Sequence, residues 1–238
     1  MAGAEAKTRQ GIAGVRFLSI LAVFAPAPAT AGAWLAPEGG QQIWTSVAGE
    51  REGVSFFESS AYFEAPVGDA TSVVVAPWVE QGYETIDGWR AEATIGAKRA
   101  LYRDDANVVA LQAGAVWMSH PGQDCSEGGA ELRLLAGRGF GRSGFANVEI
   151  ATRAFEGGCE SERLDLSVGY RPAENWLAMG QVFVDAHRDE DEPAIRAQLT
   201  MVNFRPSGRG FQFGLRGRVD GEAEEVALIV GWWGRVGD

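Results

Sequence analysis

The sequence is short of positive charge, of cysteine and histidine, and of long apolar runs. Its 21 Lys and Arg residues stand against 32 Asp and Glu, which gives a net charge of −11. That balance argues against nucleic-acid binding, which needs a basic patch, and against electrostatic adsorption to anionic lipid. Beyond the N-terminus, no apolar run approaches about 18 residues and helical periodicity is absent, so no transmembrane helix is expected.

The N-terminus has the features of a secretory signal peptide. Basic residues up to Arg16 precede an apolar run from Phe17 to Ala25, and the Ala-Thr-Ala at 29–31 fits an A-x-A cleavage site. The alternative is an uncleaved membrane anchor, but the run is shorter than the roughly 20 residues that a spanning helix needs. We therefore expect a signal peptide over residues 1–31 and a mature domain over residues 32–238.

Export changes the expected chemistry of the two cysteines, Cys125 and Cys159. They are too far apart in the sequence to form a CxxC redox or zinc motif. Compartments beyond the inner membrane are oxidising, which favours disulfides. We predict a disulfide between the two residues, with two free buried thiols as the alternative.

Clusters of Gly, Pro, Asp and Asn divide the mature chain into segments in which polar and apolar residues alternate. The pattern predicts about twelve strands. They are expected over residues 41–48, 54–65, 71–81, 88–101, 107–118, 129–138, 143–155, 162–171, 176–186, 194–204, 210–219 and 225–235. Segment 71–81 is the weakest of them, because it is apolar on both faces and contains Pro77.

The alternation gives each strand one apolar and one polar face. In residues 210–219, for example, Phe211, Phe213 and Leu215 oppose Gln212, Arg216 and Arg218. A soluble antiparallel sheet alternates in the same way, so a soluble sandwich is the alternative. These strands, however, are about 9 to 14 residues long, enough to cross a membrane when tilted. We therefore predict an all-β fold, a closed antiparallel up-and-down transmembrane β-barrel with its apolar face toward lipid.

The polar face carries charges of both signs, which can pair across strands or meet water inside a closed barrel. The residues predicted to line the lumen are Glu58, Arg90, Glu92, Lys98, Glu131, Arg133, Glu149, Arg153, Asp165, Asp185, Arg196, Arg216 and Arg218.

The connections between the strands are of two alternating kinds. One set is acidic and longer, such as the segment at 187–193, and the other is shorter with more turn-forming residues and more arginine, such as the segment at 137–142. If the hairpins meander, each set lies at one end of the barrel. Cys125 and Cys159 then fall at the same end, in neighbouring hairpins.

These features make the mature chain resemble Gram-negative outer-membrane β-barrel proteins over essentially its full length. Tryptophans near the strand ends support the resemblance, because tryptophan favours membrane interfaces; they are Trp44, Trp78, Trp89, Trp117, Trp176, Trp232 and Trp233. The resemblance implies an outer-membrane location, contacts with lipid and lipopolysaccharide, and assembly by the barrel-assembly machinery. In one departure from the class, the last residue is Asp238 and not an aromatic residue, so the strand 226–233 would have to serve as the assembly signal.

Three functions remain open from the sequence. The first is a narrow pore for small solutes, since about twelve strands fall between barrels filled by side chains and open porins. The second is a structural or surface-interaction barrel with a plugged lumen. The third is an outer-membrane lipid hydrolase using His120 or His187, although adjacent Ser119 and His120 point to opposite faces of a strand and cannot act as a pair.

No cofactor or metal site is expected from the sequence. The acidic segment 187–192 lacks the central glycine of an EF-hand loop and is interpreted as a solvated charge run. The glycine-rich segment 137–142 lies between strands and does not open a helix, so it is interpreted as a turn and not as a phosphate loop.

Overall fold

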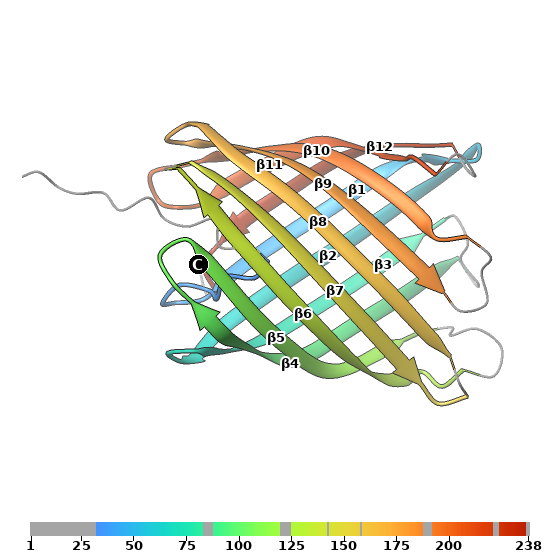
Figure 1. The fold of residues 1–238 in the computed structure, drawn as a ribbon. Helices are drawn as coiled ribbons and strands as arrows, with labels where there is room; N and C mark the ends of the chain where they lie inside the picture. Colours follow the sequence, from blue (N-terminus) through green and yellow to red (C-terminus); the bar gives the residue numbers. More distant parts are fainter. Residues whose placement is uncertain are drawn as a thin grey trace, which may run out of the picture.

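The computed structural model describes residues 32–82, 88–119, 125–141, 143–157, 159–187, 192–220 and 224–236. These residues form one closed antiparallel barrel, shown in Figure 1, in which each strand pairs with its neighbours in the sequence. The strands are β1 (Gln41–Arg51), β2 (Val54–Gly68), β3 (Thr71–Gln81), β4 (Trp89–Arg103), β5 (Asn107–Met118), β6 (Gly128–Phe140), β7 (Gly144–Phe155), β8 (Glu160–Ala173), β9 (Trp176–His187), β10 (Ala194–Phe204), β11 (Gly210–Arg218) and β12 (Glu225–Gly234).

The predicted barrel is therefore confirmed. β12 closes onto β1 through register pairs that run from Gln42 and Gly234 to Arg51 and Glu225. Closure removes the sheet edges, so the backbone groups of every strand find partners within the barrel wall. Among the described residues, no helix is long and apolar enough to span a membrane.

The outward face of the barrel is apolar. Phe211, Phe213 and Leu215 of β11 are 54%, 41% and 57% exposed, whereas Gln212 between them is only 3% exposed. The same split holds on β10, where Leu199 is 72% exposed and its neighbour Thr200 is 3% exposed. Large apolar side chains that point away from the barrel need an apolar surrounding, which lipid provides.

Irregularities in the ladders have local causes. The β2–β3 register skips the positions opposite Ala76 and Pro77, where proline has no N–H to donate to the ladder. Register shifts also occur between Pro66 and Gly68, Ala100 and Tyr102, and Tyr170 and Ala173. All three shifts lie next to short turns at one end of the barrel, consistent with the enrichment of bulges at barrel rims.

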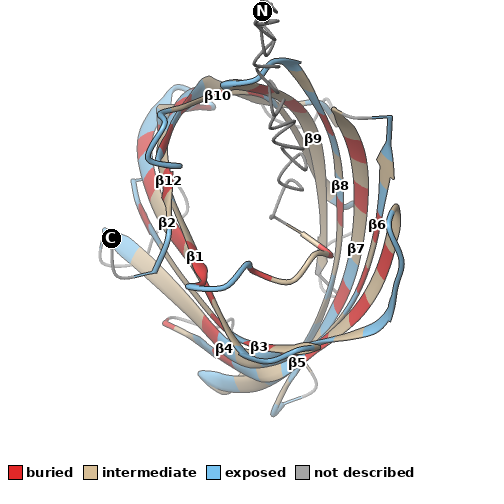
Figure 2. Ribbon diagram, turned by 90° about the vertical axis from the view of Figure 1, so that its left-hand side faces the viewer, coloured by how far each residue is buried: buried red, intermediate tan, exposed pale blue. Residues whose placement is uncertain are grey.

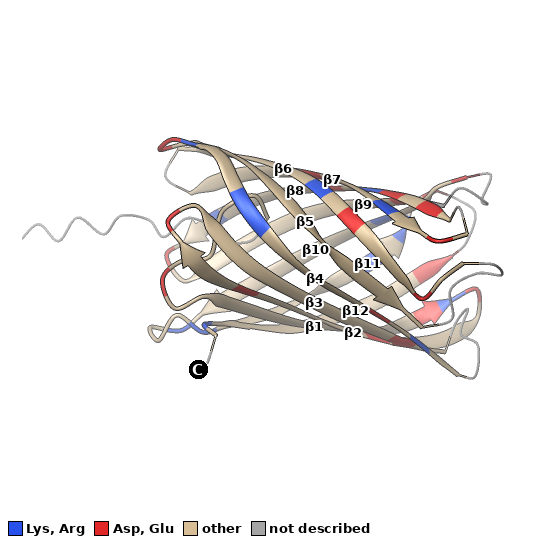
Figure 3. Ribbon diagram, turned by 90° about the horizontal axis from the view of Figure 1, so that it is seen from below, with Lys and Arg blue, Asp and Glu red and all other residues tan. Residues whose placement is uncertain are grey.

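The two ends of the barrel differ, as the alternating connections predicted. One end, called here the short-turn end, carries the connections at 69–70, 104–106, 141–143, 174–175 and 205–209. The other, the loop end, carries the connections at 52–53, 82–88, 119–127, 156–159, 188–193 and 219–224, of which the one at 52–53 is short and departs from the prediction. In Figure 3 the charged bands on the strands lie mostly toward the loop end.

At the short-turn end the interior is apolar. A cluster of buried side chains, Phe145, Leu177, Met179, Val202 and Trp233, lies inside the barrel. The prediction that Trp233 is an interface residue is wrong, because its ring is 8% exposed and its indole N–H donates to Gln212 Oε1 at 2.6 Å. Trp78 is also misassigned: its ring lies under the guanidinium of Arg90, on the polar face of β3 and β4, with 5.0 Å between the Arg90 Cζ and the ring centroid.

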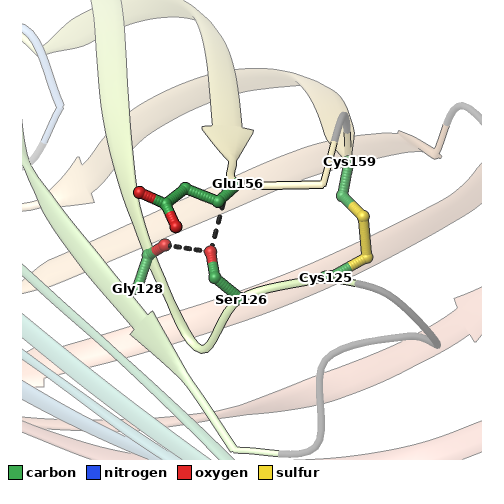
Figure 4. The surroundings of a disulfide bond; sticks show 5 residues. All are labelled: Cys125, Ser126, Gly128, Glu156 and Cys159. Carbon is green, nitrogen blue, oxygen red and sulfur yellow. Dashed lines mark hydrogen bonds between the residues drawn. A yellow bond between two sulfur atoms is a disulfide. The ribbon is translucent and has the colours of Figure 1, made fainter.

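The predicted disulfide is present at the loop end. Cys125 and Cys159 are bonded, with their Cα atoms 5.8 Å apart, and they join the connection before β6 to the one before β8 (Figure 4). Hydrogen bonds reinforce the link: the Glu156 N–H donates to Ser126 Oγ at 2.9 Å, and the Ser126 N–H donates to the Glu156 carbonyl at 3.1 Å. Two neighbouring hairpins are thereby held together outside the strands.

Residues 32–40 precede β1 and do not join the barrel wall. Figure 2 looks along the barrel and shows this segment crossing the interior before it reaches β1. Gly40, with φ +72°, makes the final bend, and a Cβ there would lie 2.7 Å from the carbonyl oxygen of Glu64. The predicted signal peptide, residues 1–31, lies outside the described residues and stays a prediction.

Candidate functional site

The polar faces of the strands bring arginines and carboxylates together inside the barrel near the loop end. Side chains alternate along a strand, so residues of one parity on each strand share the interior. Their ion pairs form one connected chain along the inner wall of the barrel, called here the charge ring. Its members are Arg51, Glu58, Glu80, Arg90, Glu92, Glu131, Arg133, Glu149, Arg153, Arg163, Asp165, Asp185, Arg196, Arg216 and Glu225.

Arg51 on β1 is the most buried cation of the ring. Its guanidinium contacts Glu225 at 2.7 Å, Glu58 at 3.2 Å and Glu80 at 3.3 Å, and its side chain is 1% exposed. Its Cζ also lies 4.6 Å from the centroid of the Phe56 ring. A buried arginine is tolerated only when its donors are satisfied, and here three carboxylates supply the acceptors.

Arg216 carries the ring past the seam where β12 meets β1. It contacts Glu58 of β2 at 2.6 Å and Glu225 of β12 at 2.6 Å. Two strands, β12 and β1, separate β11 from β2 in the barrel wall. The contact between Arg216 and Glu58 therefore passes over their inner faces, which places both side chains in the barrel interior.

Arg133 of β6 pairs with the carboxylates of its own strand and of β7 and β8. It contacts Glu149 at 2.8 Å, Glu131 at 3.2 Å and Asp165 at 3.3 Å. Arg153 of β7 then links Glu131 at 2.7 Å to Glu92 of β4 at 2.7 Å, passing over β5 and β6. The charges of three neighbouring strands, β6, β7 and β8, and of β4 are thus held in one network.

Two further arginines, Arg163 and Arg196, link the ion pairs around Arg133 to those around Arg216. Arg163 lies 2.9 Å from Asp165 and 3.6 Å from Asp185, and Arg196 lies 3.0 Å from Asp185 and 3.9 Å from Glu225. The chain of ion pairs begins at Arg90 and finishes at Glu92, which are two residues apart on the same face of β4. The ring therefore runs around the whole inner circumference.

Exposure divides the ring into a dry side and a wet side. Glu80 and Glu225 are fully buried, as Arg51 nearly is, whereas the side chains of Arg90 and Arg163 are 35% and 34% exposed. Both exposed arginines lie near the loop-end starts of β4 (Trp89–Arg103) and β8 (Glu160–Ala173), so the more exposed part of the ring lies toward that end. Ion pairs that keep contact with water avoid most of the desolvation cost of a buried pair.

Most of the residues that the sequence predicted to line the lumen take part in these ion pairs. Every residue predicted to line the lumen belongs to the ring except Lys98 and Arg218. Arg218 pairs with Asp220 at 2.7 Å, and Lys98 pairs with Glu64 at 2.8 Å. Whether these side chains line an open water-filled lumen stays a prediction.

Four members of the ring were missed: Arg51, Glu80, Arg163 and Glu225. Arg51 fell in the predicted connection after segment 41–48. Arg163 and Glu225 lie within the predicted segments 162–171 and 225–235 but were not assigned to the polar face. Glu80 lies on the strand that is apolar on both faces. Their position within strands could have identified them, because a charged side chain near the middle of a membrane-spanning strand is far less costly on the inner face than on the lipid face.

The described residues do not test a catalytic role of His120 or His187, which stays a prediction. The Ser119 hydroxyl oxygen accepts the backbone N–H of Ala91 at 2.7 Å, and the Ser119 N–H donates to the Ala91 carbonyl at 2.8 Å. Ser119 thus has a structural role at the end of β5. His120 and the acidic segment 188–191 lie outside the described residues, and so does the side chain of His187. Across the described ranges, no group of His, Cys, Asp and Glu side chains is placed to hold a metal ion.

No protein-family model and no curated protein sequence matches this chain. Solved structures do. An outer-membrane channel from Pseudomonas putida F1 superposes with a TM-score of 0.60 and 10% identity over 87% of this chain and 98% of its own. The fold is similar to that of this outer-membrane β-barrel.

Two porins give the same result. The NanC porin matches with a TM-score of 0.59 and 10% identity over 79% of this chain and 98% of its own. The KdgM porin, solved in complex with disordered oligogalacturonate, matches with a TM-score of 0.59 and 5% identity over 80% of this chain and 97% of its own. The predicted resemblance to outer-membrane β-barrels is confirmed at the level of the fold, and at these identities it carries no shared function.

Proposed function

We propose that this protein is an outer-membrane channel that passes small solutes through a narrow constriction at the charge ring. The observation that carries the proposal is the wet side of the ring, where Arg90 and Arg163 are about one-third exposed inside a closed wall. A closed barrel whose interior keeps water beside its charges is suited to conduction. A barrel of this strand number leaves room for a narrow passage only.

The barrel ends support an orientation. Outer-membrane barrels place their short turns in the periplasm and their longer connections outside the cell. By this rule the charge ring and the disulfide lie toward the extracellular side, and the apolar cluster lies toward the periplasm. The signal peptide over residues 1–31 would deliver the chain to this membrane.

The ring predicts weak discrimination by charge. Its arginines and carboxylates neutralise one another at distances of 2.6 to 3.9 Å. A solute passing the ring therefore meets little net field, in contrast to pores lined by one sign of charge. Neutral and charged small solutes should both pass, with size as the main filter. Oligogalacturonate, the molecule bound to the similar KdgM porin, is a suitable acidic test solute.

A planar-bilayer recording tests the proposal. The reversal potential of the intact protein in a KCl gradient should lie near zero. Arg163→Gln should shift it toward cation selectivity and Glu92→Gln toward anion selectivity, since each removes one charge from the wet side of the ring. Glu162→Gln, an exposed residue on the outer face of β8, is the matched control and should leave it unchanged. Absence of conductance, both in the intact chain and after removal of residues 34–38, would refute the pore.

A second candidate function has its own support. A barrel with a closed lumen that presents its loops to a partner would fit the apolar cluster that fills the short-turn end and the disulfide that ties two loops together. The same recordings separate the two functions, because a permanently closed barrel gives no conductance in any of these variants.

A further inference from the structure

The segment that crosses the barrel interior, Gly32 to Gly40, is called here the strap. It is packed as a core element and not as a loose end. Ala33 is fully buried and Ala36 is 7% exposed. The exposed part of the segment is the bend at 37–39, just before β1. A terminal segment with so little exposure must be held by specific contacts.

Two buried charged residues hold the strap backbone. Lys98 Nζ donates to the carbonyls of Gly32 at 2.8 Å and Trp34 at 2.7 Å, and it contacts Glu64 at 2.8 Å. The Ala36 N–H donates to Glu64 Oε1 at 3.0 Å. An ammonium group has three donors, and the strap accepts two of them. Because Lys98 and Glu64 are both fully buried, removing the strap would leave donors without acceptors in a place where that is costly.

Trp34 connects the strap to both sides of the barrel. Its ring packs edge-on against Phe145, with centroids 6.1 Å apart. It contacts the cluster that includes Leu177 and Trp233, and also a second cluster that contains Ala33, Val108, Ala110 and Leu135. The first cluster lines β7, β9, β10 and β12, and the second lines β5 and β6. Apolar contacts through Trp34 therefore span the interior.

A glycine on β6 makes room for this ring. A Cβ on Gly137 would lie 2.5 Å from Trp34 Cζ3, so any larger residue would displace the indole or strain its position. Gly139, on the same face of β6, has no such neighbour: its Cβ would meet only backbone oxygens at 3.6 and 4.0 Å. The strand is thus shaped for the strap at one position.

We propose that the strap is a closure of the short-turn mouth, and that solutes pass only when it leaves its site at Lys98 and Glu64. This inference rests on the proposed channel function. It accounts for the difference between the two ends of the interior, where partly exposed charges lie toward the loop end and an apolar cluster lies at the short-turn end. The occupant of the Lys98–Glu64 site is the chain's own backbone.

Thiol labelling tests whether the strap is seated. Both native cysteines are in the disulfide and no other cysteine is free in the described part of the chain, so an introduced cysteine gives a single reactive thiol. With a charged maleimide as the probe, Glu38→Cys should label at once, whereas Ala33→Cys should label many-fold more slowly. Adding Gly137→Ala to Ala33→Cys should raise its labelling rate several-fold, and adding Gly139→Ala should not. Equal labelling at positions 33 and 38, or equal effects of the two glycine variants, would overturn the seated strap.

Conductance tests whether the strap closes the pore. Deleting residues 34–38 should raise the single-channel conductance several-fold over the intact chain, with a boiling-dependent band shift on a gel showing that the barrel remains folded. Equal, non-zero conductance in both proteins would overturn the closure and leave the channel function standing. Silence in both would overturn the channel function, and the closure with it, while the labelling result would still show whether the strap occupies its site.

Discussion

Replacing Leu199 by arginine should damage insertion of the barrel far more than the same change one residue earlier. Leu199 is the central residue of β10 (Ala194–Phe204), is 72% exposed and faces outward. At about 3.4 Å per residue and a tilt of about 45°, the strand on either side covers about 12 Å of depth, which is half of an apolar band about 25 Å tall. Leu199 therefore lies close to the bilayer midplane.

The expected cost follows from that depth. An arginine facing lipid at the midplane costs about 2 to 4 kcal/mol, or roughly 30- to 1000-fold in the folding equilibrium. The matched change, Gln198→Arg, places the charge inside the barrel and removes one hydrogen bond, from Gln198 to Gln181 at 2.7 Å. That loss is worth about 1 kcal/mol.

The assay is folding into lipid vesicles over a range of urea concentrations, with the fraction folded read from the band shift of unboiled samples. The midpoint should fall clearly for Leu199→Arg and only slightly for Gln198→Arg. Equal damage by the two variants would refute the assignment of faces, and greater damage by Gln198→Arg would reverse it.

Three further predictions concern the ring, the disulfide and one turn. Glu225→Gln should lower the free energy of unfolding by about 3 kcal/mol, because it leaves buried arginines short of an acceptor, whereas the exposed control Glu50→Gln should change it little in the same urea titration. Intact-mass analysis after alkylation should find no reactive thiol without reductant, and reduction of Cys125–Cys159, 34 residues apart, should lower the free energy of unfolding by up to about 4 kcal/mol. Hydrogen bonds to Asp104 in its turn lower the pKa of that carboxyl below its ordinary value, so the turn should keep its contacts at mildly acidic pH and lose them only as the pH falls through the lowered pKa. An NMR titration with a midpoint for Asp104 at or above 3.8 would contradict this last prediction.

The barrel wall was predictable from the sequence because its determinants are local. Turn residues on either side delimited segments 71–81, 107–118 and 194–204 at the observed bounds, and period-2 alternation supported segment 194–204. Other strands extend a few residues further at their ends, as β2 does to Gly68. The prediction held even at Pro77, where the pattern was weakest, because the missing N–H interrupts only one ladder of β3.

The contents of the interior were less predictable, because they depend on distances around the barrel. Alternation showed that Arg216 faces inward but not that it reaches Glu58 across two strands. It treated Lys98 as one more lumen charge, whereas this residue binds the chain's own backbone. The strap has no periodic pattern that would have predicted its path. The need for glycine at position 137 is explained only by the ring of Trp34, which packs against it.

Membrane fractionation of the expressed full-length protein, combined with heat-modifiability on a gel, distinguishes a barrel embedded in lipid from a soluble fold. We expect recovery in the outer membrane and a mobility shift that depends on boiling, as a stably closed barrel gives. Recovery in the soluble periplasm without a shift would contradict it, since the outward apolar face would then have to be a protein core and not a surface for lipid.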